Sequence, residues 1–303
     1  MNYPLLSIKI DVDTDRGTRI GVPNLLNLFA EYGIRASFLF ALGPDNTGRA
    51  IKRIFRPGFL SKVSRTSVVS TYGLRTLMNG VFLPGPHVGR RNETVMRLAR
   101  EKGHEVGIHC YDHIRWQDGL AKMGRDEVYE EFGKARKEFE RVFGERAKTA
   151  GSAGWQANSF SLAAYDDAGL LYASDARGTH PFFPRVDNTV FKTPQIPTTL
   201  PTLDELLGRP EYPDALIVGH YLSLLKADAL NVLTVHAEIE GMNKISLFRT
   251  LLTALRGRNV RIMKLDDLSR DLLQRPEAIP VCDLISGTVD GRSGTLAVQR
   301  CSG

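Results

Sequence analysis

The sequence contains few cysteines and no long apolar run, and both shortages narrow the possible classes of protein. Its three cysteines, Cys110, Cys282 and Cys301, have neither paired nor zinc-like spacing. This indicates neither a disulfide framework nor a structural zinc site, and we expect reduced thiols. No stretch approaches the roughly 20 apolar residues that span a bilayer, and no signal peptide precedes the strand-like residues 5–10. We therefore expect a protein on the cytoplasmic side of the membrane.

Internal repeats and low-complexity tracts are also absent from the sequence, which excludes a solenoid or a disordered array. With 303 residues and an apolar content of 42%, the chain can bury a substantial core. Short β-branched runs alternate with segments of helical periodicity. We expect strands at residues 7–12, 36–42, 105–109, 148–151, 170–174, 215–219, 232–236 and 260–264, and helices at residues 23–32, 93–102, 126–143, 159–168 and 244–256.

Alternating strands and helices predict an α/β fold with a mostly parallel sheet, either closed into a barrel or left open. Catalytic groups in such folds lie at the carboxyl ends of the strands. The helix expected from Pro23 has proline in its first turn and ends at Gly33, as helix-terminal signals predict. Residues 276–303 show no regular pattern, and we expect an irregular tail there.

The excess positive charge is concentrated in one segment. The net charge of the chain is +6, but residues 44–91 contain nine lysines and arginines and a single acid, Asp45. The remainder of the chain is therefore slightly acidic, and attraction to an anionic partner is expected of this segment alone.

Two acids follow the first expected strand. Asp11 and Asp13 lie two residues apart at its end, and the two-residue period of a strand points both carboxylates to the same side of the sheet. Two acids placed in this way can act as a metal ligand and a base. The alternative is a strand end followed by the turn at Asp15, where aspartate is common in any protein.

Two histidines follow another expected strand. His109 and His113 have i,i+4 spacing, which in a helical turn places two imidazoles on one face, as metal binding requires. The chain contains seven histidines, and such a pair can arise by chance. Asp13 is expected at the same edge of the sheet, however. Two imidazoles and one carboxylate form a divalent metal site with open positions for water and a substrate oxygen.

A third strand end also carries a candidate side chain. His236 closes the strand expected at residues 232–236. A lone histidine at the end of a strand is more often a packed core residue than a catalyst. An aspartate and histidines at three separate strand ends of one sheet favour the catalytic interpretation.

Together these residues resemble the motifs of a known family, the polysaccharide deacetylases of the NodB homology type. That family has an aspartate-rich first motif, a His-x-x-x-His second motif and a fifth motif that ends in histidine. The resemblance implies a distorted (β/α) barrel at residues 1–275 with residues 44–91 as a basic amphipathic insertion. It assigns one role to each candidate: the base is Asp11, the acid is His236, and the ligands of one divalent metal ion are Asp13, His109 and His113.

Most of the chain resembles one branch of the family. This branch consists of the deformylases of 4-deoxy-4-formamido-L-arabinose linked to undecaprenyl phosphate. The matching segments are IDVDT at residues 10–14, RGT at 16–18, GVP at 21–23, GIRASF at 33–38, GPDN at 43–46, AGW at 153–155 and VHAE at 235–238. This resemblance implies release of formate and of a 4-amino sugar lipid that is used in lipid A modification and in resistance to cationic antimicrobial peptides. The alternative is a sugar N-deacetylase of the same family with another substrate.

The chain departs from the wider family at the third motif. The pattern Arg-x-Pro-Tyr is replaced by AGWQ at residues 153–156, so the residue that orients the base in place of the arginine is not evident. Asp175 is a candidate to hold His236 as an imidazolium, and the alternative for Asp175 is a surface aspartate in a turn. The metal is open as well, since Zn²⁺, Mn²⁺, Co²⁺ and Fe²⁺ all accept the ligand set.

The basic insertion has an amphipathic pattern. Four apolar residues fall at helical spacing opposite four cations; the two sets are Ile51, Ile54, Phe55 and Phe59, and Arg49, Lys52, Arg53 and Arg56. This pattern describes a helix in the headgroup plane of an anionic leaflet, and we expect peripheral contact with the cytoplasmic face of the bacterial inner membrane. The alternative is that the apolar face packs on the barrel while the cations are solvated.

Two other classes of protein share parts of the pattern. Two histidines and one carboxylate also suit non-haem Fe(II) oxygenases, but those sites usually come from antiparallel double-sheet folds. A nucleic-acid-binding protein would explain the basic segment, but its cations are interleaved with aliphatic residues and no nucleic-acid module is evident in the sequence. We therefore expect no nucleic-acid partner.

Overall fold

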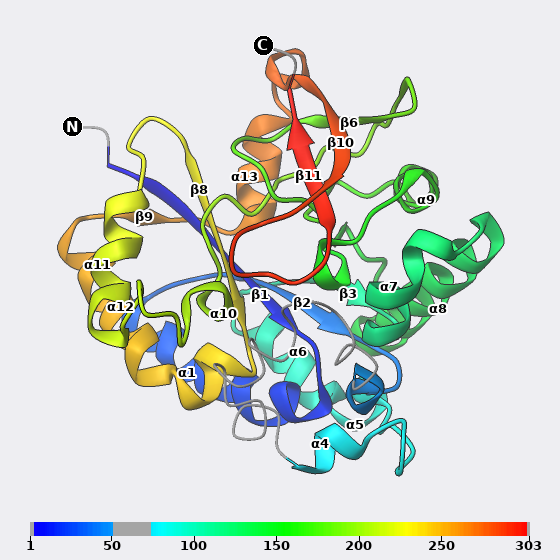
Figure 1. Ribbon diagram of the computed structural model, residues 1–303, viewed down its shortest axis with the longest axis horizontal. Coiled ribbons are helices and arrows are strands. Elements are labelled where there is room, and N and C mark those ends of the chain that lie inside the picture. Colours follow the sequence, from blue (N-terminus) through cyan, green and yellow to red (C-terminus); the bar gives the residue numbers. More distant parts are fainter. Residues whose placement is uncertain (1–2, 51–73, 302–303) are drawn as a thin grey trace.

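A seven-stranded parallel sheet lies at the centre of the computed structural model, which describes residues 3–50 and 74–301 (Figure 1). The sheet has the order β5-β4-β3-β2-β1-β8, with β9 beside the first residues of β1. Its strands are β1 (Leu5–Val12), β2 (Ser37–Ala41), β3 (Glu105–Cys110), β4 (Thr149–Ala150), β5 (Tyr172–Ala173), β8 (Leu230–His236) and β9 (Arg261–Ile262). The predicted parallel α/β sheet is confirmed.

An extended segment, residues 194–200, fills the space between the outer strands β5 and β8. On one side the backbone N–H of Ile196 donates to the carbonyl of Ala173 in β5 at 2.8 Å. On the other side Leu200 donates to Val232 in β8 at 3.1 Å. Because this segment connects the two edges of the sheet, the structure is a distorted (β/α) barrel, as predicted.

Helices surround the sheet and cover its apolar side chains. The longer ones are α1 (Val22–Tyr32), α6 (Glu93–Glu101), α8 (Arg125–Phe143), α9 (Ser159–Ala168), α11 (Asp214–Leu224), α12 (Ile245–Gly257) and α13 (Leu265–Leu272). Helix α1 has Pro23 in its first turn and ends at Gly33, whose φ of 67° is left-handed, so the predicted helix ends are confirmed. Within the described ranges, none of these helices has both the length and the apolarity of a membrane span.

Residues 215–219 were expected to form a strand, and this prediction is wrong because they lie in helix α11. The short run of apolar residues is compatible with either structure. Ile217 and Tyr221 are buried on one face of the helix, four residues apart, whereas Leu216 is 61% exposed. The buried residues therefore follow a helical period, but this period becomes visible only when residues beyond 219 are included.

The C-terminal residues are not an irregular tail, which corrects a second expectation. They form the antiparallel hairpin β10 (Val281–Gly287) and β11 (Leu296–Arg300). This hairpin joins β6 (Phe183–Val186) and β7 (Thr189–Val190) in a second sheet of order β11-β10-β6-β7.

The expectation of three reduced cysteines is also corrected. Cys282 and Cys301 form a disulfide, and Cys110 is a buried free thiol. In the β10–β11 hairpin Asp283 pairs with Arg300, so the next position places Cys282 opposite Cys301, with 4.5 Å between their Cα atoms. The pairing depends on the hairpin register, which the spacing of the cysteines does not reveal.

The glycine motifs near the N-terminus are explained by close backbone packing. Two short helices, η1 (Gly17–Gly21) and η5 (Ile239–Asn243), pack against each other just beyond β1 and β8. A side chain on Gly21 would overlap the carbonyl oxygen of Ala237, and one on Gly17 would overlap the carboxylate of Glu238. Glycine is therefore required at both positions for close approach.

The basic insertion is described only at its ends. The expected amphipathic helix falls on residues outside the described ranges, namely Ile51, Lys52, Arg53, Ile54, Phe55, Arg56 and Phe59. The two described ends pair with each other, since Val88 donates to Gly43 at 2.8 Å and Asp45 donates to Pro86 at 2.9 Å. Leu42 in turn donates to Cys110 at the end of β3. The insertion therefore leaves and rejoins the barrel at the carboxyl edge of β2 and β3.

Candidate active site

The carboxyl end of β1 carries the two expected acids. Asp11 is buried within the strand, and Asp13 follows directly after it. Strand β8 runs beside β1 in parallel register, and Asp11 is the register partner of His236. Two residues that are 225 positions apart in sequence therefore become neighbours through the pairing of two central strands.

The two histidines of the second motif meet by a route that differs from the expected helical turn. His109 belongs to β3, whereas His113 is the first residue of helix α7 (His113–Gly119). The turn between them is fixed by Asp112, whose carboxylate caps α7 by accepting from the Arg115 N–H at 3.0 Å. The ring centroids of His109 and His113 are 5.3 Å apart. The strand-to-helix turn thus brings both imidazoles to the edge where Asp13 lies.

Asp13, His109 and His113 form a three-donor cluster. Nε2 of His109 lies 3.2 Å from Oδ1 of Asp13, and Nε2 of His113 lies 3.5 Å from Oδ2. One ligand atom from each residue lies within 4.8 Å of the others. Oδ1 of Asp13 is buried, and no donor from the described residues hydrogen-bonds to it. A carboxylate whose two oxygens each face an imidazole nitrogen, one of them buried without a hydrogen-bond donor in the described part of the chain, fits a divalent metal ion.

The electrostatics of the cluster favour an ionised Asp13. Burial alone would raise the pKa of Asp13, but His113 and His109 outweigh it and hold this pKa far below its ordinary value. Nδ1 of His109 lies 2.6 Å from the carbonyl oxygen of Gly151. A ring N–H donated to that carbonyl leaves Nε2 free to act as a metal ligand.

The backbone that carries Asp13 is held by Glu238. Oε1 of this buried glutamate accepts from the N–H groups of Asp13 and Thr14 at 3.1 and 2.9 Å, and from the Thr14 hydroxyl at 2.8 Å. Glu238 had no assigned role in the sequence, although it belongs to the VHAE segment. The sequence feature that could have indicated a role for Glu238 is its position just after β8, two residues after His236.

The cation beside the expected base is Lys9. Its Nζ lies 3.3 Å from Oδ2 of Asp11 and donates to the carbonyl of Ser174 at 3.1 Å. Lys9 is fully buried in β1. The sequence contained the signal for this contact, because Lys9, Asp11 and Asp13 alternate along one strand and therefore share one face.

Asp175 does not contact His236, contrary to expectation. Its carboxylate accepts from the N–H of Ser152 at 2.7 Å and from the side-chain amide of Gln195 at 2.9 Å. The acid beside His236 is Asp204, whose Oδ1 lies 3.9 Å from Nδ1 of the imidazole. Asp204 precedes β8 in the chain by a long connection, and nothing in the sequence pairs it with His236.

Trp155 of the AGW segment packs beside the same imidazole. The centroid of its ring lies 6.2 Å from the centroid of the His236 ring, and the two ring planes meet at 73°. Three cations lie over the indole, at 5.3 Å for Lys9, 5.5 Å for Arg177 and 4.4 Å for Arg292. Arg292 comes from the connection between β10 and β11 and lies 3.6 Å from Asp204. The C-terminal hairpin thus contributes to the wall of the site.

The fold and site agree with comparisons to known proteins. The family model of the polysaccharide deacetylases matches residues 12–173, more than half of the chain. The chain belongs to the polysaccharide deacetylase family. Its barrel resembles that of a Mycobacterium smegmatis protein named as a polysaccharide deacetylase, with a TM-score of 0.64, 14% identity and coverage of 94% of this chain and 96% of the other. It also resembles PuuE allantoinase, with a TM-score of 0.59, 15% identity and coverage of 89% and 90%.

Two curated relatives match almost the whole chain. A protein from Shewanella sediminis is 36% identical over 98% of this chain and 95% of its own length. A protein from Wigglesworthia glossinidia brevipalpis is 31% identical over 94% of this chain and 98% of its own length. Both carry the name 4-deoxy-4-formamido-L-arabinose-phosphoundecaprenol deformylase ArnD. The family and the parallel sheet favour amide hydrolysis over the oxygenase alternative.

Proposed function

We propose that this protein is a metal-dependent deformylase acting on 4-deoxy-4-formamido-L-arabinose linked to undecaprenyl phosphate. The observation that carries the proposal is the cluster of Asp13, His109 and His113, which lies beside Asp11 and His236 in a chain with full-length relatives of that name. The products are formate and the 4-amino sugar lipid, and this lipid serves lipid A modification and resistance to cationic antimicrobial peptides.

The reaction adds water across the C–N bond of the formamide, so one group must take a proton from water and another must give one to the leaving nitrogen. When held by Asp13, His109 and His113, a divalent ion supplies Lewis acidity for the attacking water and the formyl oxygen. We assign proton removal to Asp11, whose Oδ1 is buried and accepts no hydrogen bond within the described part of the chain. That oxygen is therefore available to a water molecule.

His236 gives a proton to nitrogen 4 of the sugar in this proposal. The amine that leaves is strongly basic, so C–N cleavage needs an acid close by. Asp204 lies 3.9 Å from Nδ1 of His236 and is the acid that faces this imidazole. Asp204 thus takes the role expected of Asp175, and Lys9 takes the role of the family's third-motif arginine by holding Asp11.

The membrane assignment rests on the position of the insertion. Its described ends lie at the edge of the sheet that carries His109, and three neighbouring residues of the second end, Val81, Phe82 and Leu83, are exposed. Phe82 is 78% exposed. A substrate on a long lipid stays at the bilayer, so an apolar and basic segment at the mouth of the site would bring enzyme and headgroup together. We place the protein at the cytoplasmic face of the inner membrane.

The test of the proposed function is the identity of the acid that is released. Purified enzyme loaded in turn with Zn²⁺, Mn²⁺, Co²⁺ or Fe²⁺ is incubated with formamido- and acetamido-sugar lipid phosphates. We expect formate from the first substrate and little acetate from the second. Acetate as the main product would identify a sugar N-deacetylase instead, and failure of every metal to support hydrolysis would refute the metal-dependent mechanism.

A further inference from the structure

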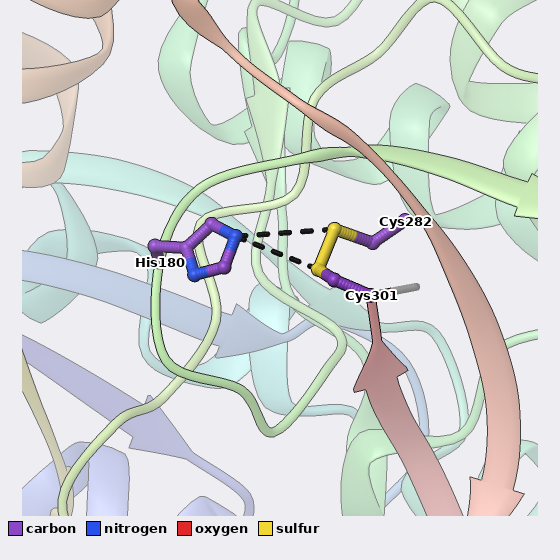
Figure 2. Close-up of side chains that lie close together, drawn as sticks. All are labelled: His180, Cys282 and Cys301. Atoms are coloured by element: carbon purple, nitrogen blue, oxygen red, sulfur yellow. Dashed lines mark hydrogen bonds between the residues drawn. A yellow bond between two sulfur atoms is a disulfide. The ribbon is translucent and has the colours of Figure 1, made fainter. Parts of the chain in front are cut away.

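A second cluster of metal-ligating side chains lies away from the active site, in the C-terminal sheet. His180 approaches the sulfur atoms of Cys282 and Cys301, as Figure 2 shows. Its Nε2 lies 3.9 Å from Sγ of Cys282 and 3.5 Å from Sγ of Cys301. Cys282 is fully buried in β10, Cys301 is exposed just after β11, and His180 precedes β6. The proposed deformylase chemistry uses none of these three residues.

The imidazole of His180 is held with Nε2 directed at the sulfurs. Its Nδ1 lies 2.9 Å from the hydroxyl of Thr179. The side chain of Gln299 fixes the same loop, because its Oε1 accepts from the N–H of Thr179 at 2.8 Å and its Nε2 donates to the carbonyl of His180 at 3.0 Å. Partners of this kind orient the metal-binding nitrogen of histidine in known metal sites.

We infer that Cys282, Cys301 and His180 bind one soft divalent ion such as zinc when the disulfide is reduced. Two thiolates and an imidazole are common zinc ligands, and a water can complete the tetrahedron. With ordinary Zn–S and Zn–N bonds, tetrahedral geometry puts each sulfur about 3.6 Å from the nitrogen. The observed separations of 3.5 and 3.9 Å already match this value.

The disulfide and the metal-bound form exclude each other. Reduction by a dithiol breaks the S–S bond of this pair, forms one in the reductant and leaves two thiols with their protons. The two sulfurs then move apart to about 3.8 Å, and a bound zinc ion displaces both protons. Cys301 is the exposed residue of the pair, so we expect a reductant to attack at this cysteine.

The disulfide joins the two strands of the C-terminal hairpin to each other, and the metal-bound form would also join them to the loop that carries His180. Beside the cluster, the N–H of Arg177 donates to Ala297 at 2.9 Å and that of Gln299 donates to Arg177 at 2.8 Å, so β11 already pairs with the loop that carries His180. The same hairpin delivers Arg292 to Asp204 in the active site. The disulfide would be lost in a reducing compartment, and the bound metal would then keep Cys282 and Cys301 together and hold them to His180.

The test uses cobalt(II) as a spectroscopic probe on full-length protein reduced with a phosphine, which binds metal less than a dithiol does. The active-site cluster contains no sulfur, so a thiolate-to-cobalt absorption band in the near ultraviolet reports the second site alone. We expect this band in the reduced wild type and about two cobalt ions per chain. We also expect the band to disappear on oxidation to the disulfide and on addition of zinc.

Variants separate the two sites. Cys301→Ser, at an exposed position, should abolish the band and leave about one cobalt ion per chain, and His180→Ala should weaken cobalt binding at this site. His113→Ala should keep the band while it loses the other ion, and Cys110→Ser, which removes the remaining thiol, should keep it as well. Circular dichroism confirms that each variant is folded. Absence of the band in the reduced wild type, or its persistence in Cys301→Ser, would overturn the inference.

Discussion

The ammonium group of Lys9 lies 3.3 Å from the carboxylate of Asp11, and both side chains are buried in β1. The contact gives Asp11 a fixed orientation next to the metal-ligand cluster. A second bond from Lys9 to the carbonyl of Ser174 near β5 fixes the ammonium itself. In the proposed mechanism, Lys9 of the first strand therefore takes the place of the arginine that the family resemblance implies in the third motif.

Replacement of Lys9 should slow turnover without removing the metal. Lys9→Met leaves Asp11 as a buried carboxylate without its cation, so we expect the value of kcat to fall by about 10- to 100-fold. The free energy of unfolding should fall by about 3–5 kcal/mol. KM and the metal content should change little, since Lys9 is not one of the metal ligands. Steady-state kinetics measure kcat and KM, and elemental analysis measures the metal content. Denaturant unfolding measures the free energy of unfolding.

Lys9→Arg is the matched control for this variant. Arginine keeps the charge, so it should restore much of the turnover lost in Lys9→Met if the ion pair positions the base. Equal losses of turnover in both variants would contradict a role of the positive charge of Lys9 in positioning Asp11.

The main features of the fold and site follow from local sequence patterns. Asp11, Asp13 and His236 could be located because they lie at or just after the carboxyl ends of strands with a clear apolar pattern, and parallel strands present these ends at one edge. Lys9 was accessible to the same logic, because it shares the strand face of Asp11. The two-residue period of the strand is therefore sufficient to place Lys9 on the same face as Asp11.

The parts that could not be predicted depend on long-range packing. Asp204 meets His236 only because a long connection folds back over the barrel, and no local period records that path. Cys282 and Cys301 form a pair because of the register of a hairpin whose strands are short and irregular in composition. Helix α11 was missed because a short apolar run is compatible with both strand and helix.

Asp11→Asn should separate metal binding from catalysis. The amide cannot take a proton from water, but Asp13, His109 and His113 remain in place. We expect formate release to fall by about 10²-fold or more, with the metal content unchanged. Formate release near the wild-type rate would refute the role of Asp11 as base, and loss of the metal would make Asp11 a ligand.

Asp204→Asn and Asp175→Asn should differ in their effects on turnover. Asp204 lies near the imidazole of His236, so its neutral variant should slow the release of a basic amine by about 10- to 100-fold. The loss should shrink on substrates whose leaving nitrogen is less basic. Asp175 bonds to Ser152 and Gln195, so Asp175→Asn should mainly lower the melting temperature. Equal kinetic losses in the two variants would contradict the assignment to Asp204.

Glu240 should make the stability of the protein depend on pH. Burial raises the pKa of this glutamate from 4.5 to about 8, so between these values the folded chain retains a proton that the unfolded chain has released. The free energy of unfolding should therefore fall as the pH rises through this window, by up to about 1.4 kcal/mol per pH unit, and the loss should level off above pH 8.

Glu240→Gln resembles the protonated glutamate and does not titrate. The Gln side-chain oxygen can still accept from the N–H of His236, as Glu240 does at 3.0 Å. Denaturant unfolding at several pH values between 5 and 9 should show a shallower decline for the variant than for the wild type. Parallel curves would show that Glu240 is not the titrating group.

The insertion should bind anionic membranes without contributing to the chemistry. Lys52→Glu, Arg53→Glu and Arg56→Glu together should weaken binding to anionic liposomes by several kcal/mol, at about 1 kcal/mol per basic residue plus repulsion from the new acids. Phe82→Ser should weaken the binding as well, because burial of an aromatic side chain contributes about 1.5–3 kcal/mol. Liposome flotation measures both effects.

Leu216→Ser is the control for Phe82→Ser, because Leu216 is 61% exposed on helix α11 and does not belong to residues 44–91. It should leave flotation unchanged. The charge-reversal and Phe82 variants should still hydrolyse a soluble, lipid-free formamido-sugar phosphate at the wild-type rate, since none of the altered residues belongs to the proposed site. If hydrolysis of the soluble substrate is lost together with hydrolysis of the lipid substrate, the insertion packs on the catalytic barrel. If flotation is unchanged in both variants, the membrane contact lies on another surface.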